Sequence, residues 1–409
     1  MSGGFFVARY RFLCGVNVAI LHQHFKAPDR GGAIRSYYLA RALVLAGCRV
    51  TVLTGHNGSY RYEHLSGIDI YWLPVAYDNR FGFAARSWSF LRYILAVRRY
   101  RHLIKSADVC YAISVPLTTG IAAMRIRKRY GIPFIFEVGD LWPDAPIQLG
   151  FIRNRLLQRA LHALERKIYS KASAVVALSA PIRAAIESRV NGKEIYVIPN
   201  MADTRFYFPV EKDSDIAHEY GVSGFVVSYL GALGYANGLD YIMKCAESCR
   251  ARNLTVTFLI CGDGAELDTL RKKAEEASLE NVRMIPFQNR EGVRKLMRVT
   301  DAVFVCYRPV PVLETGSPNK YFDGLAAGKL IVVNFGGWIR DEIEAEQCGI
   351  YVDPHDSNSF ADRLTPFLND ASLLHRYQNN ARRLAEAKYS REQLGRQYAE
   401  IVRAYGQRK

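Results

Sequence analysis

The stretch Glu314-Thr-Gly-Ser-Pro-Asn-Lys-Tyr-Phe-Asp323, continued by Gly-Leu-Ala-Ala-Gly-Lys, lies between two apolar runs, 302–306 and 330–334. The runs have the length and composition of buried strands, and the segment between them predicts a turn at Ser-Pro-Asn and a helix beginning near Asp323. Strand, helix and strand in this order indicate a parallel sheet covered by helices. The segment also joins two carboxylates and a lysine, which can hold the hydroxyls and the diphosphate of a sugar nucleotide. It therefore predicts an α/β fold and a phosphate-and-sugar site.

The same alternation of apolar strands and amphipathic helices continues through the whole chain of 409 residues. In the first half, strands are expected at 18–23, 49–54, 70–74, 109–113, 134–138, 174–179 and 195–198. In the second half they are expected at 225–230, 256–261, 282–286, 302–306, 330–334 and 350–352. This pattern is typical of parallel sheets wrapped by helices.

The region from residue 199 to about 221 has no apolar periodicity and is predicted to be a linker. We therefore expect a first domain at residues 1–203 and a second at 204–389, each long enough for its own core. A C-terminal helix at about 390–409 is expected to pack back on the first domain. Ligands of doubly wound sheets bind at the carboxyl ends of the strands, so the two domains are expected to face each other across a ligand-binding cleft.

Charge is divided unequally between the two halves. Residues 1–200 contain 28 Lys and Arg against 11 Asp and Glu, whereas the remainder contains 27 against 28. An excess of this size indicates a polyanionic partner, which can be nucleic acid, anionic lipid or a phosphorylated substrate. No run is long and apolar enough for a membrane span, and Arg9 and Arg11 interrupt any signal peptide at the start, so we expect a cytosolic protein.

Basic and apolar residues mix between 86 and 105 and again between 151 and 171. Such helices can lie in a layer of lipid headgroups, or they can pack their apolar side on the core; the sequence leaves both interpretations open. In the first segment the expected membrane contacts are Trp88, Arg92, Arg98, Arg99 and Arg101.

Several motifs occur in a characteristic order. They are Gly31-Gly-Ala-Ile-Arg35, Phe136-Glu-Val-Gly-Asp-Leu-Trp-Pro143, Ile198-Pro-Asn200, Tyr229-Leu-Gly-Ala-Leu-Gly234, Cys261-Gly-Asp-Gly264 and Ser317-Pro-Asn-Lys320. Their order and spacing resemble the retaining glycosyltransferases of family 4, which have the GT-B architecture of two Rossmann-like domains. Within that family the chain resembles bacterial polysaccharide and O-antigen enzymes that transfer L-N-acetylfucosamine and similar amino sugars.

The resemblance implies transfer of a sugar with retention, from a nucleoside diphosphate donor to a polyprenyl-diphosphate-linked saccharide. It implies UDP before GDP, no divalent metal or other cofactor, and a peripheral position on the anionic cytoplasmic leaflet of the inner membrane. Nucleic acid is not an expected partner. Two other classes stay open from the sequence: a nucleotide-sugar 2-epimerase or hydrolase on the same fold, and a nucleic-acid-binding protein suggested by the basic half.

The donor site is expected where strands lead into helices. Glycines at these turns let backbone N–H groups approach a diphosphate closely. The basic pair that the family commonly places beside the second glycine loop is missing, so Lys320 is expected to carry most of the phosphate charge. The expected donor-binding residues are Gly31, Gly32, Gly231, Gly234, Ser317, Pro318, Asn319, Lys320 and Asp323.

Three side chains, Asp140, Glu314 and Lys320, form the expected catalytic set. Glu314 and Asp323 resemble the family's Glu-x7-Glu motif, with eight intervening residues and Asp in second place. By resemblance Asp323 would accept the ribose hydroxyls and Glu314 those of the donor sugar, since a carboxylate can accept two O–H groups at once. Asp140 follows a predicted strand, with Gly139 where many family members have a histidine, and is expected to orient the sugar or the acceptor hydroxyl.

Overall fold

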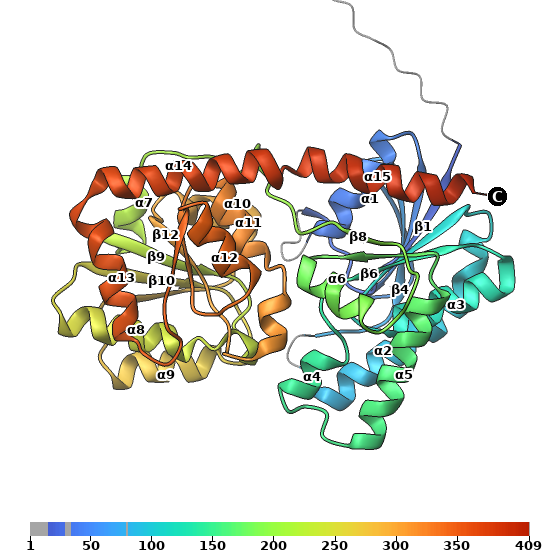
Figure 1. Ribbon diagram of the computed structural model, residues 1–409, viewed down its shortest axis with the longest axis horizontal. Helices are drawn as coiled ribbons and strands as arrows, with labels where there is room; N and C mark the ends of the chain where they lie inside the picture. Colours follow the sequence, from blue (N-terminus) through green and yellow to red (C-terminus); the bar gives the residue numbers. More distant parts are fainter. Residues whose placement is uncertain (1–14, 29–33, 79–80, 409) are drawn as a thin grey trace, which may run out of the picture.

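The computed structural model describes residues 15–28, 34–78 and 81–408, which form two Rossmann-like domains lying side by side (Figure 1). Each domain is a mainly parallel sheet covered by helices, and the two sheets are separate. The expectation of two doubly wound domains is therefore confirmed.

The first sheet has the strand order β3-β4-β2-β1-β5-β6-β7-β8. Its strands are β1 (Asn17–Leu21), β2 (Arg49–His56), β3 (Arg61–Leu65), β4 (Ile68–Pro74), β5 (Val109–Ile113), β6 (Phe134–Val138), β7 (Ala174–Ala177) and β8 (Ile195–Val197). All pairings are parallel except that of β3 with β4. We did not predict β3, because this edge strand is mostly polar and lacks the apolar run of a buried strand.

The second sheet has the order β11-β10-β9-β12-β13-β14 and is parallel throughout. Its strands are β9 (Phe225–Leu230), β10 (Val256–Cys261), β11 (Val282–Ile285), β12 (Ala302–Val305), β13 (Leu330–Val333) and β14 (Gly349–Tyr351). Every residue of β9, β10, β12 and β13 is buried. Because helices cover both faces of such a sheet, its central strands are continuous apolar runs, and this made them predictable.

Helices connect the strands in both domains. Those of the first domain are α1 (Arg35–Leu45), α2 (Phe83–Tyr100), the short 3₁₀ helix η2 (Arg101–Ile104), α3 (Thr118–Tyr130), α4 (Asp144–Gln148), α5 (Arg155–Lys171) and α6 (Ala180–Glu187). Those that follow are α7 (Ser214–Glu219), η3 (Tyr235–Asn237), α8 (Asp240–Ala251), α9 (Leu267–Glu276), α10 (Arg290–Met297), η4 (Pro311–Thr315), α11 (Asn319–Ala326), α12 (Trp338–Ala345), α13 (Asn358–Asn369), α14 (Ala371–Lys388) and α15 (Arg391–Gln407).

The expected linker is not without structure, because α7 lies within it. Asp213 caps this helix, since its carboxylate accepts hydrogen bonds from the N–H groups of Asp215 and Ile216. A helix of only six residues can form with local hydrogen bonds and an N-cap, and it is too short to show an apolar periodicity in the sequence. The structure therefore adds one helix, from Ser214 onward, to the region that we predicted as a linker.

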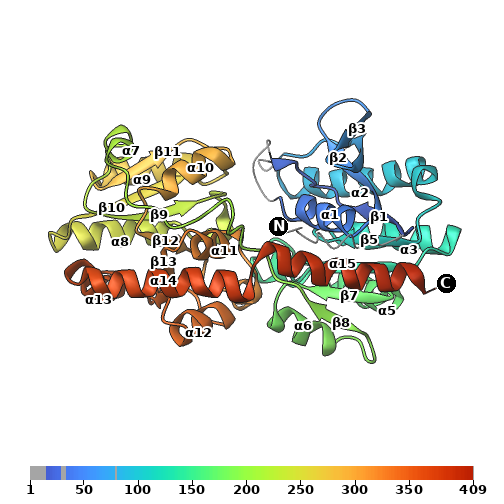
Figure 2. The same ribbon diagram turned by 90° about the horizontal axis from the view of Figure 1, so that it is seen from above.

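The chain crosses between the domains twice, and the two crossings are hydrogen-bonded to each other. Ala202 donates its N–H to the carbonyl of Tyr389 at 2.8 Å, and its own carbonyl accepts the N–H of Arg391 at 3.1 Å. After the second crossing α15 lies on the first domain against α1, β1 and β5. Figure 2 shows α14 and α15 as one band that runs over both domains.

Candidate active site

The segment that dominates the sequence lies at the boundary between the domains. The helix η4 contacts α4 and α6 of the first domain. The N–H of Val312 donates to Gln148 at 3.0 Å, and the Ser179 hydroxyl donates to the Thr315 carbonyl at 2.6 Å. The loop that follows β12 is therefore held against residues that follow β6 and β7, at the carboxyl ends of both sheets.

The helix of this segment begins earlier than expected. Pro318 is the N-cap of α11, which starts at Asn319, so Asp323 lies one turn inside the helix and not near its start. Ser-Pro-Asn is thus the helix entrance, because the fixed φ of proline suits this position. Residues three apart lie on the same face of a helix, which puts Lys320 and Asp323 side by side.

Lys320 points toward the glycine loop after β9. Its Nζ is 4.6 Å from the centroid of the Tyr229 ring, and a Cβ placed on Gly231 would be 3.0 Å from Nζ. Burial lowers the pKa of Lys320 to about 8, although nearby Cys306 and Asp323 partly oppose this shift. Among the described residues its ammonium has no hydrogen-bond or ion-pair partner, so it is available to an anion.

Asp323 is a desolvated carboxylate. Burial raises its pKa to about 7, Asp203 raises it further, and the charges of Arg290 and Lys320 oppose the shift. No hydrogen bond to this carboxylate is present in the described part of the chain. A carboxylate with this combination of partial burial and no partner can accept hydrogen bonds from ligand hydroxyls.

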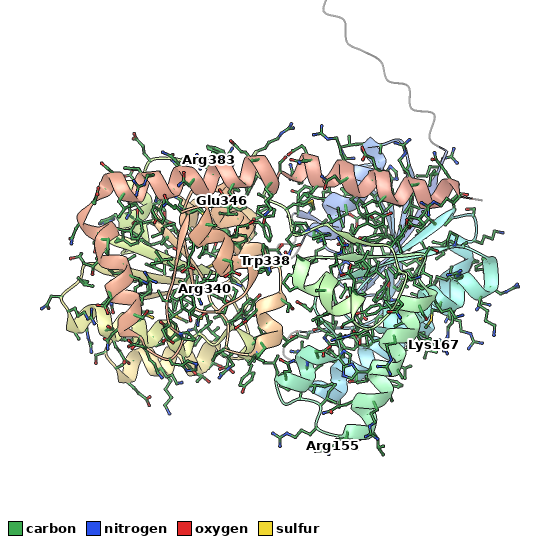
Figure 3. All side chains as sticks on the ribbon, in the orientation of Figure 1. Arg155, Lys167, Trp338, Arg340, Glu346 and Arg383 are labelled. Atoms are coloured by element: carbon green, nitrogen blue, oxygen red, sulfur yellow. The ribbon has the colours of Figure 1, made fainter. Side chains whose placement is uncertain are left out.

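Glu314 lies on the other side of the same loop region. Both of its carboxylate oxygens are 3.3 Å from the position that a Cβ on Gly336 would occupy. Gly337, with φ +83°, leads directly into α12, whose Trp338 donates its indole N–H to the Gly316 carbonyl at 2.9 Å. Figure 3 places Trp338 at the boundary between the two domains. Glu314 therefore stands at this boundary, beside the loop that follows β13.

Asp140 is the predicted site residue that the first domain contributes to this region. It directly follows the Gly139 turn after β6, and its side chain reaches solvent. The surrounding protein raises its pKa by desolvation. Its negative charge in turn helps to raise the pKa of Tyr307, which belongs to the second domain. Asp140 thus faces the second domain.

The remaining predicted donor residues have different surroundings. Gly231, with φ +149°, lies so close to Gly262 that a Cβ on Gly262 would be 1.8 Å from the Gly231 carbonyl oxygen. Gly234 is the N-cap of η3, and Asn319 is exposed. Gly31 and Gly32 lie outside the described residues.

Ser317 contacts the interdomain crossing. Its hydroxyl accepts the N–H of Asn200 at 3.1 Å, and its carbonyl accepts the Asn200 amide. Ser317 is also buried. The hydroxyl oxygen therefore ties the loop before α11 to the interdomain crossing.

Arg290, on α10, was not predicted from the sequence. Its guanidinium forms an ion pair with Asp203, donates to the Tyr38 hydroxyl at 2.7 Å and lies 3.6 Å from the centroid of the Phe206 ring. It thereby joins the crossing to both domains and influences Asp323. No sequence signal marks it, because its partners come from two segments that are distant from it in the sequence.

One group of described residues has the composition of a metal site. Ligand atoms of Asp144, His162 and Glu165 lie within 4.8 Å of one another. Arg189 donates to Asp144 at 2.8 Å and to Glu165 at 2.5 Å, so an arginine already neutralises these acids. The group is best described as an ion-pair network of the first domain. The Asp213-Ser-Asp215 sequence also has two acidic residues, but its Asp213 carboxylate caps α7.

Helix α2, which contains most of the first basic segment, has one face in the core and one face exposed. Tyr93, Ile94 and Val97 are buried in the core. On the opposite side Trp88 is 59% exposed, Leu91 45% and Leu95 48%. The expected contacts Arg92, Arg98 and Arg99 are exposed and Arg101 is half-buried. Among the described helices none is long and apolar enough to cross a bilayer.

Comparison with known proteins agrees with this architecture. Residues 30–201 match the family described as Glycosyl transferase 4-like domain, and residues 215–384 match Glycosyl transferases group 1. An uncharacterized glycosyltransferase of Methanocaldococcus jannaschii is 22% identical, over 91% of this chain and 94% of its own. A putative colanic acid biosynthesis glycosyl transferase of Escherichia coli, WcaI, is 23% identical over 71% of this chain and 72% of its own.

Three solved structures have the same fold. Sucrose-phosphate synthase of Thermosynechococcus elongatus has a TM-score of 0.78 at 17% identity and covers 95% of this chain and 98% of its own. Anabaena HepE in complex with UDP-glucose has a TM-score of 0.67 at 19% identity, with 95% and 99% covered. WaaG, a glycosyltransferase involved in lipopolysaccharide biosynthesis, has a TM-score of 0.69 at 15% identity, with 94% and 99% covered.

The two family matches follow each other along the chain, one on each domain. The chain therefore belongs to the glycosyltransferases of the GT-B fold, with a glycosyl transferase 4-like domain followed by a group 1 domain.

Proposed function

We propose that this enzyme transfers a sugar from a nucleoside diphosphate, preferentially UDP, with retention of configuration and without a metal ion. The observation that carries the proposal is the pair Lys320 and Asp323, one turn apart on α11, unpartnered among the described residues and next to Gly231. A cation suits the diphosphate and a carboxylate suits the ribose hydroxyls. The similarly folded HepE was crystallised with UDP-glucose, which supports a nucleotide sugar as donor.

The roles of the side chains follow from where charge develops. As the bond from the anomeric carbon to the diphosphate breaks, the leaving phosphate gains negative charge, which Lys320 and the backbone N–H groups at the start of α11 stabilise. Asp323 holds the ribose and Glu314 the hydroxyls of the sugar. The acceptor hydroxyl attacks from the face that the phosphate leaves, and a phosphate oxygen takes its proton. Asp140 orients that hydroxyl from the first domain.

The acceptor in this proposal is a polyprenyl-diphosphate-linked saccharide at the cytoplasmic face of the inner membrane, and the transferred sugar is an amino or deoxyamino sugar. The first domain binds the acceptor and faces the anionic leaflet. The exposed residues Trp88, Leu91 and Leu95 beside Arg92 support this orientation. The printed names of WcaI and WaaG, which refer to colanic acid and lipopolysaccharide, support a product in surface polysaccharide synthesis.

The test has two steps. A thermal-shift panel of nucleotides and sugar nucleotides should select UDP compounds, because a ligand at about 100 times its dissociation constant adds roughly 2.7 kcal/mol to the free energy of unfolding. The selected donor is then incubated with and without a lipid-linked acceptor, and the anomeric configuration of the product is determined by NMR. Transfer only with acceptor, and with retention, supports the proposal. Release or epimerisation of the sugar without acceptor would identify a hydrolase or an epimerase.

A further inference from the structure

A groove of about 350 Å³ lies between the outer end of α2 with η2 and the helix α3. Its apolar lining consists of Ile94, Val97, Ala122 and Ile126. Five cations also line it: Arg98, Arg101, Arg125, Lys128 and Arg129. No acidic side chain lines it. The groove thus combines an apolar lining with a strongly positive charge.

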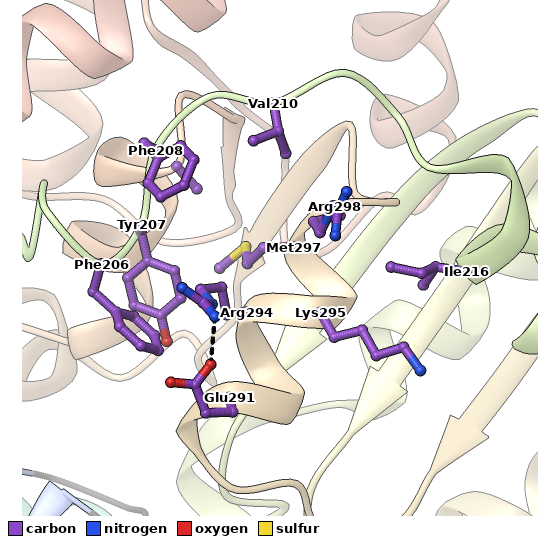
Figure 4. Close-up of a pocket in the computed structure, with 11 residues that line it drawn as sticks. Phe206, Tyr207, Phe208, Val210, Ile216, Glu291, Arg294, Lys295, Met297 and Arg298 are labelled. Atoms are coloured by element: carbon purple, nitrogen blue, oxygen red, sulfur yellow. Dashed lines mark ion pairs between the residues drawn. The ribbon is translucent and has the colours of Figure 1, made fainter.

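These five cations have no acidic partner among the described residues, and the only contact found for them there is that of Arg129, which lies 5.6 Å from the centroid of the Tyr130 ring. A larger pocket of about 500 Å³ in the second domain provides the contrast (Figure 4). Its three cations are each paired with a carboxylate, in the pairs Arg294–Glu291, Lys295–Glu219 and Arg298–Asp213. Unpaired like charges repel one another, and a bound anion relieves this repulsion. The groove on α2 and α3 therefore favours an anionic occupant, whereas the larger pocket does not.

The groove is remote from the site of transfer. The first half of α2 lies near Asp140, since the Phe90 ring is 6.4 Å from the ring of Trp142. From Phe90 to Arg101 the helical path extends about 16 Å further, at about 1.5 Å per residue. Figure 1 shows α3 at the end of the first domain that points away from the second. The occupant of the groove is therefore neither the donor nor the reacting end of the acceptor.

We propose that the groove binds the phosphate headgroup of an anionic membrane phospholipid. The cations recognise the phosphate, while the apolar lining is the buried floor of the groove. The exposed Trp88, Leu91 and Leu95 lie on the same helix, on the side away from the buried Ile94 and Val97, so α2 offers apolar side chains to a bilayer next to the cations of the groove. A free anion would make no use of these apolar side chains.

The proposal rests on the membrane association proposed above and adds a second anchoring point. A lipid in the groove would hold the C-terminal end of α2 at the membrane, while the N-terminal half of α2 stays beside the site of transfer. The sequence had indicated only the α2 side of this surface, and the residues from α3 are new.

The experiment compares two triple variants with the wild-type enzyme in flotation with vesicles. The groove variant is Arg125→Gln, Lys128→Gln, Arg129→Gln, which leaves the apolar lining unchanged. The matched control is Lys244→Gln, Arg363→Gln, Arg383→Gln, which removes the same charges from exposed positions of the second domain. Figure 3 shows Arg383 on the opposite side of the molecule from Arg155 of the first domain. Vesicles are phosphatidylcholine, with or without phosphatidylglycerol.

We expect the wild type and the control to float equally with phosphatidylglycerol vesicles. The groove variant should partition roughly 100-fold less, the loss expected for three cations near an anionic surface. Equal losses in both variants would mean a diffuse effect of net charge and would overturn the proposal, as would wild-type flotation of the groove variant. Titration calorimetry with inorganic phosphate and with a short-chain, soluble phosphatidylglycerol gives a second measurement. A groove that binds inorganic phosphate as tightly as the lipid is not a lipid site.

A third outcome separates this inference from the proposed function. The thermal shift with UDP is measured on the same three proteins and should be identical, because the groove is remote from Lys320 and Asp323. If the wild type does not float with either vesicle, membrane association and the groove proposal both fail, whereas the assignment of the donor site stands on the UDP result. If UDP does not bind but flotation is lost in the groove variant, the lipid site stands without the donor.

Discussion

Replacing Asp323 by asparagine should make the free enzyme more stable and its nucleotide binding weaker. In the wild type, folding moves this carboxylate from water to a site where its pKa is raised from 3.8 to about 7. An amide of nearly the same shape does not carry this cost. The wild-type enzyme therefore has a lower free energy of unfolding than the variant, and in return it has a charged group that can bind the ligand.

The size of the effect follows from the pKa shift. A shift of this size corresponds to at most about 4 kcal/mol, at about 1.36 kcal/mol per unit. Asp323 is partly exposed, and its loss also removes an attraction to Lys320, so we expect about 2 kcal/mol. For a domain of this size that is a rise in Tm of about 4 to 8 °C.

The pH dependence identifies the carboxylate as the cause. Below its unfolded pKa, Asp323 is protonated in both states and costs nothing. As the pH rises toward about 7 the unfolded state ionises first, so the wild type loses stability, and above about 7 the loss is complete. The advantage of Asp323→Asn should therefore grow between pH 5 and pH 8. Calorimetric unfolding at several pH values measures it, with Asp268→Asn as a control, since the Asp268 side chain is 98% exposed.

Binding of UDP by the same variant is measured by titration calorimetry. Loss of a charged acceptor for the ribose hydroxyls should weaken it roughly 10- to 100-fold, which corresponds to about 1.5 to 3 kcal/mol. A variant that gains the same stability at pH 5 and pH 8 would refute the desolvation argument. Unchanged affinity for UDP would refute the contact with ribose.

Four further outcomes are expected. Lys320→Ala should weaken UDP binding by roughly 10-fold or more in calorimetry, since it removes the cation nearest the glycine loop, and wild-type affinity would exclude its contact with the diphosphate. Gly231→Ala should lower both Tm and UDP affinity, because alanine is strained at φ +149° and its Cβ would displace the Lys320 amine; a crystal structure with that amine unmoved would contradict the reasoning. UDP affinity should be highest between about pH 7 and 8, because Asp323 is protonated below this range and Lys320 loses its proton above it; a flat profile would argue against both roles. Asn200→Ala should lower the free energy of unfolding by about 1 to 3 kcal/mol, since the side-chain amide no longer donates to the buried Ser317 carbonyl, while the backbone N–H of residue 200 still donates to the Ser317 hydroxyl; UDP affinity should stay within a few-fold of the wild type.

Local sequence determined most of the strands and part of the proposed donor site. Strands such as Val256–Cys261 are apolar except for one threonine because both faces of the sheet are covered, and a run of this kind is visible without any knowledge of its neighbours. Lys320 and Asp323 lie on one helix three positions apart, so helical geometry alone brings them together. The start of that helix at Pro318 was misplaced because a Ser-Pro-Asn sequence suits both a turn and a helix entrance.

Tertiary structure alone decided the contacts between segments that are distant in sequence. Arg290 reaches Asp203 and Tyr38 only because the crossing between the domains runs beside α10. The groove between α2 and α3 is lined by basic residues from both helices. Taken alone, each helix has the positive charge of an ordinary solvent-exposed face. Whether such charges are neutralised or left unpaired depends on which helices pack side by side. The packing of the helices follows from the order of strands in the sheet. Strand order depends on the free energy of the whole fold and cannot be predicted from the periodicity of a single segment.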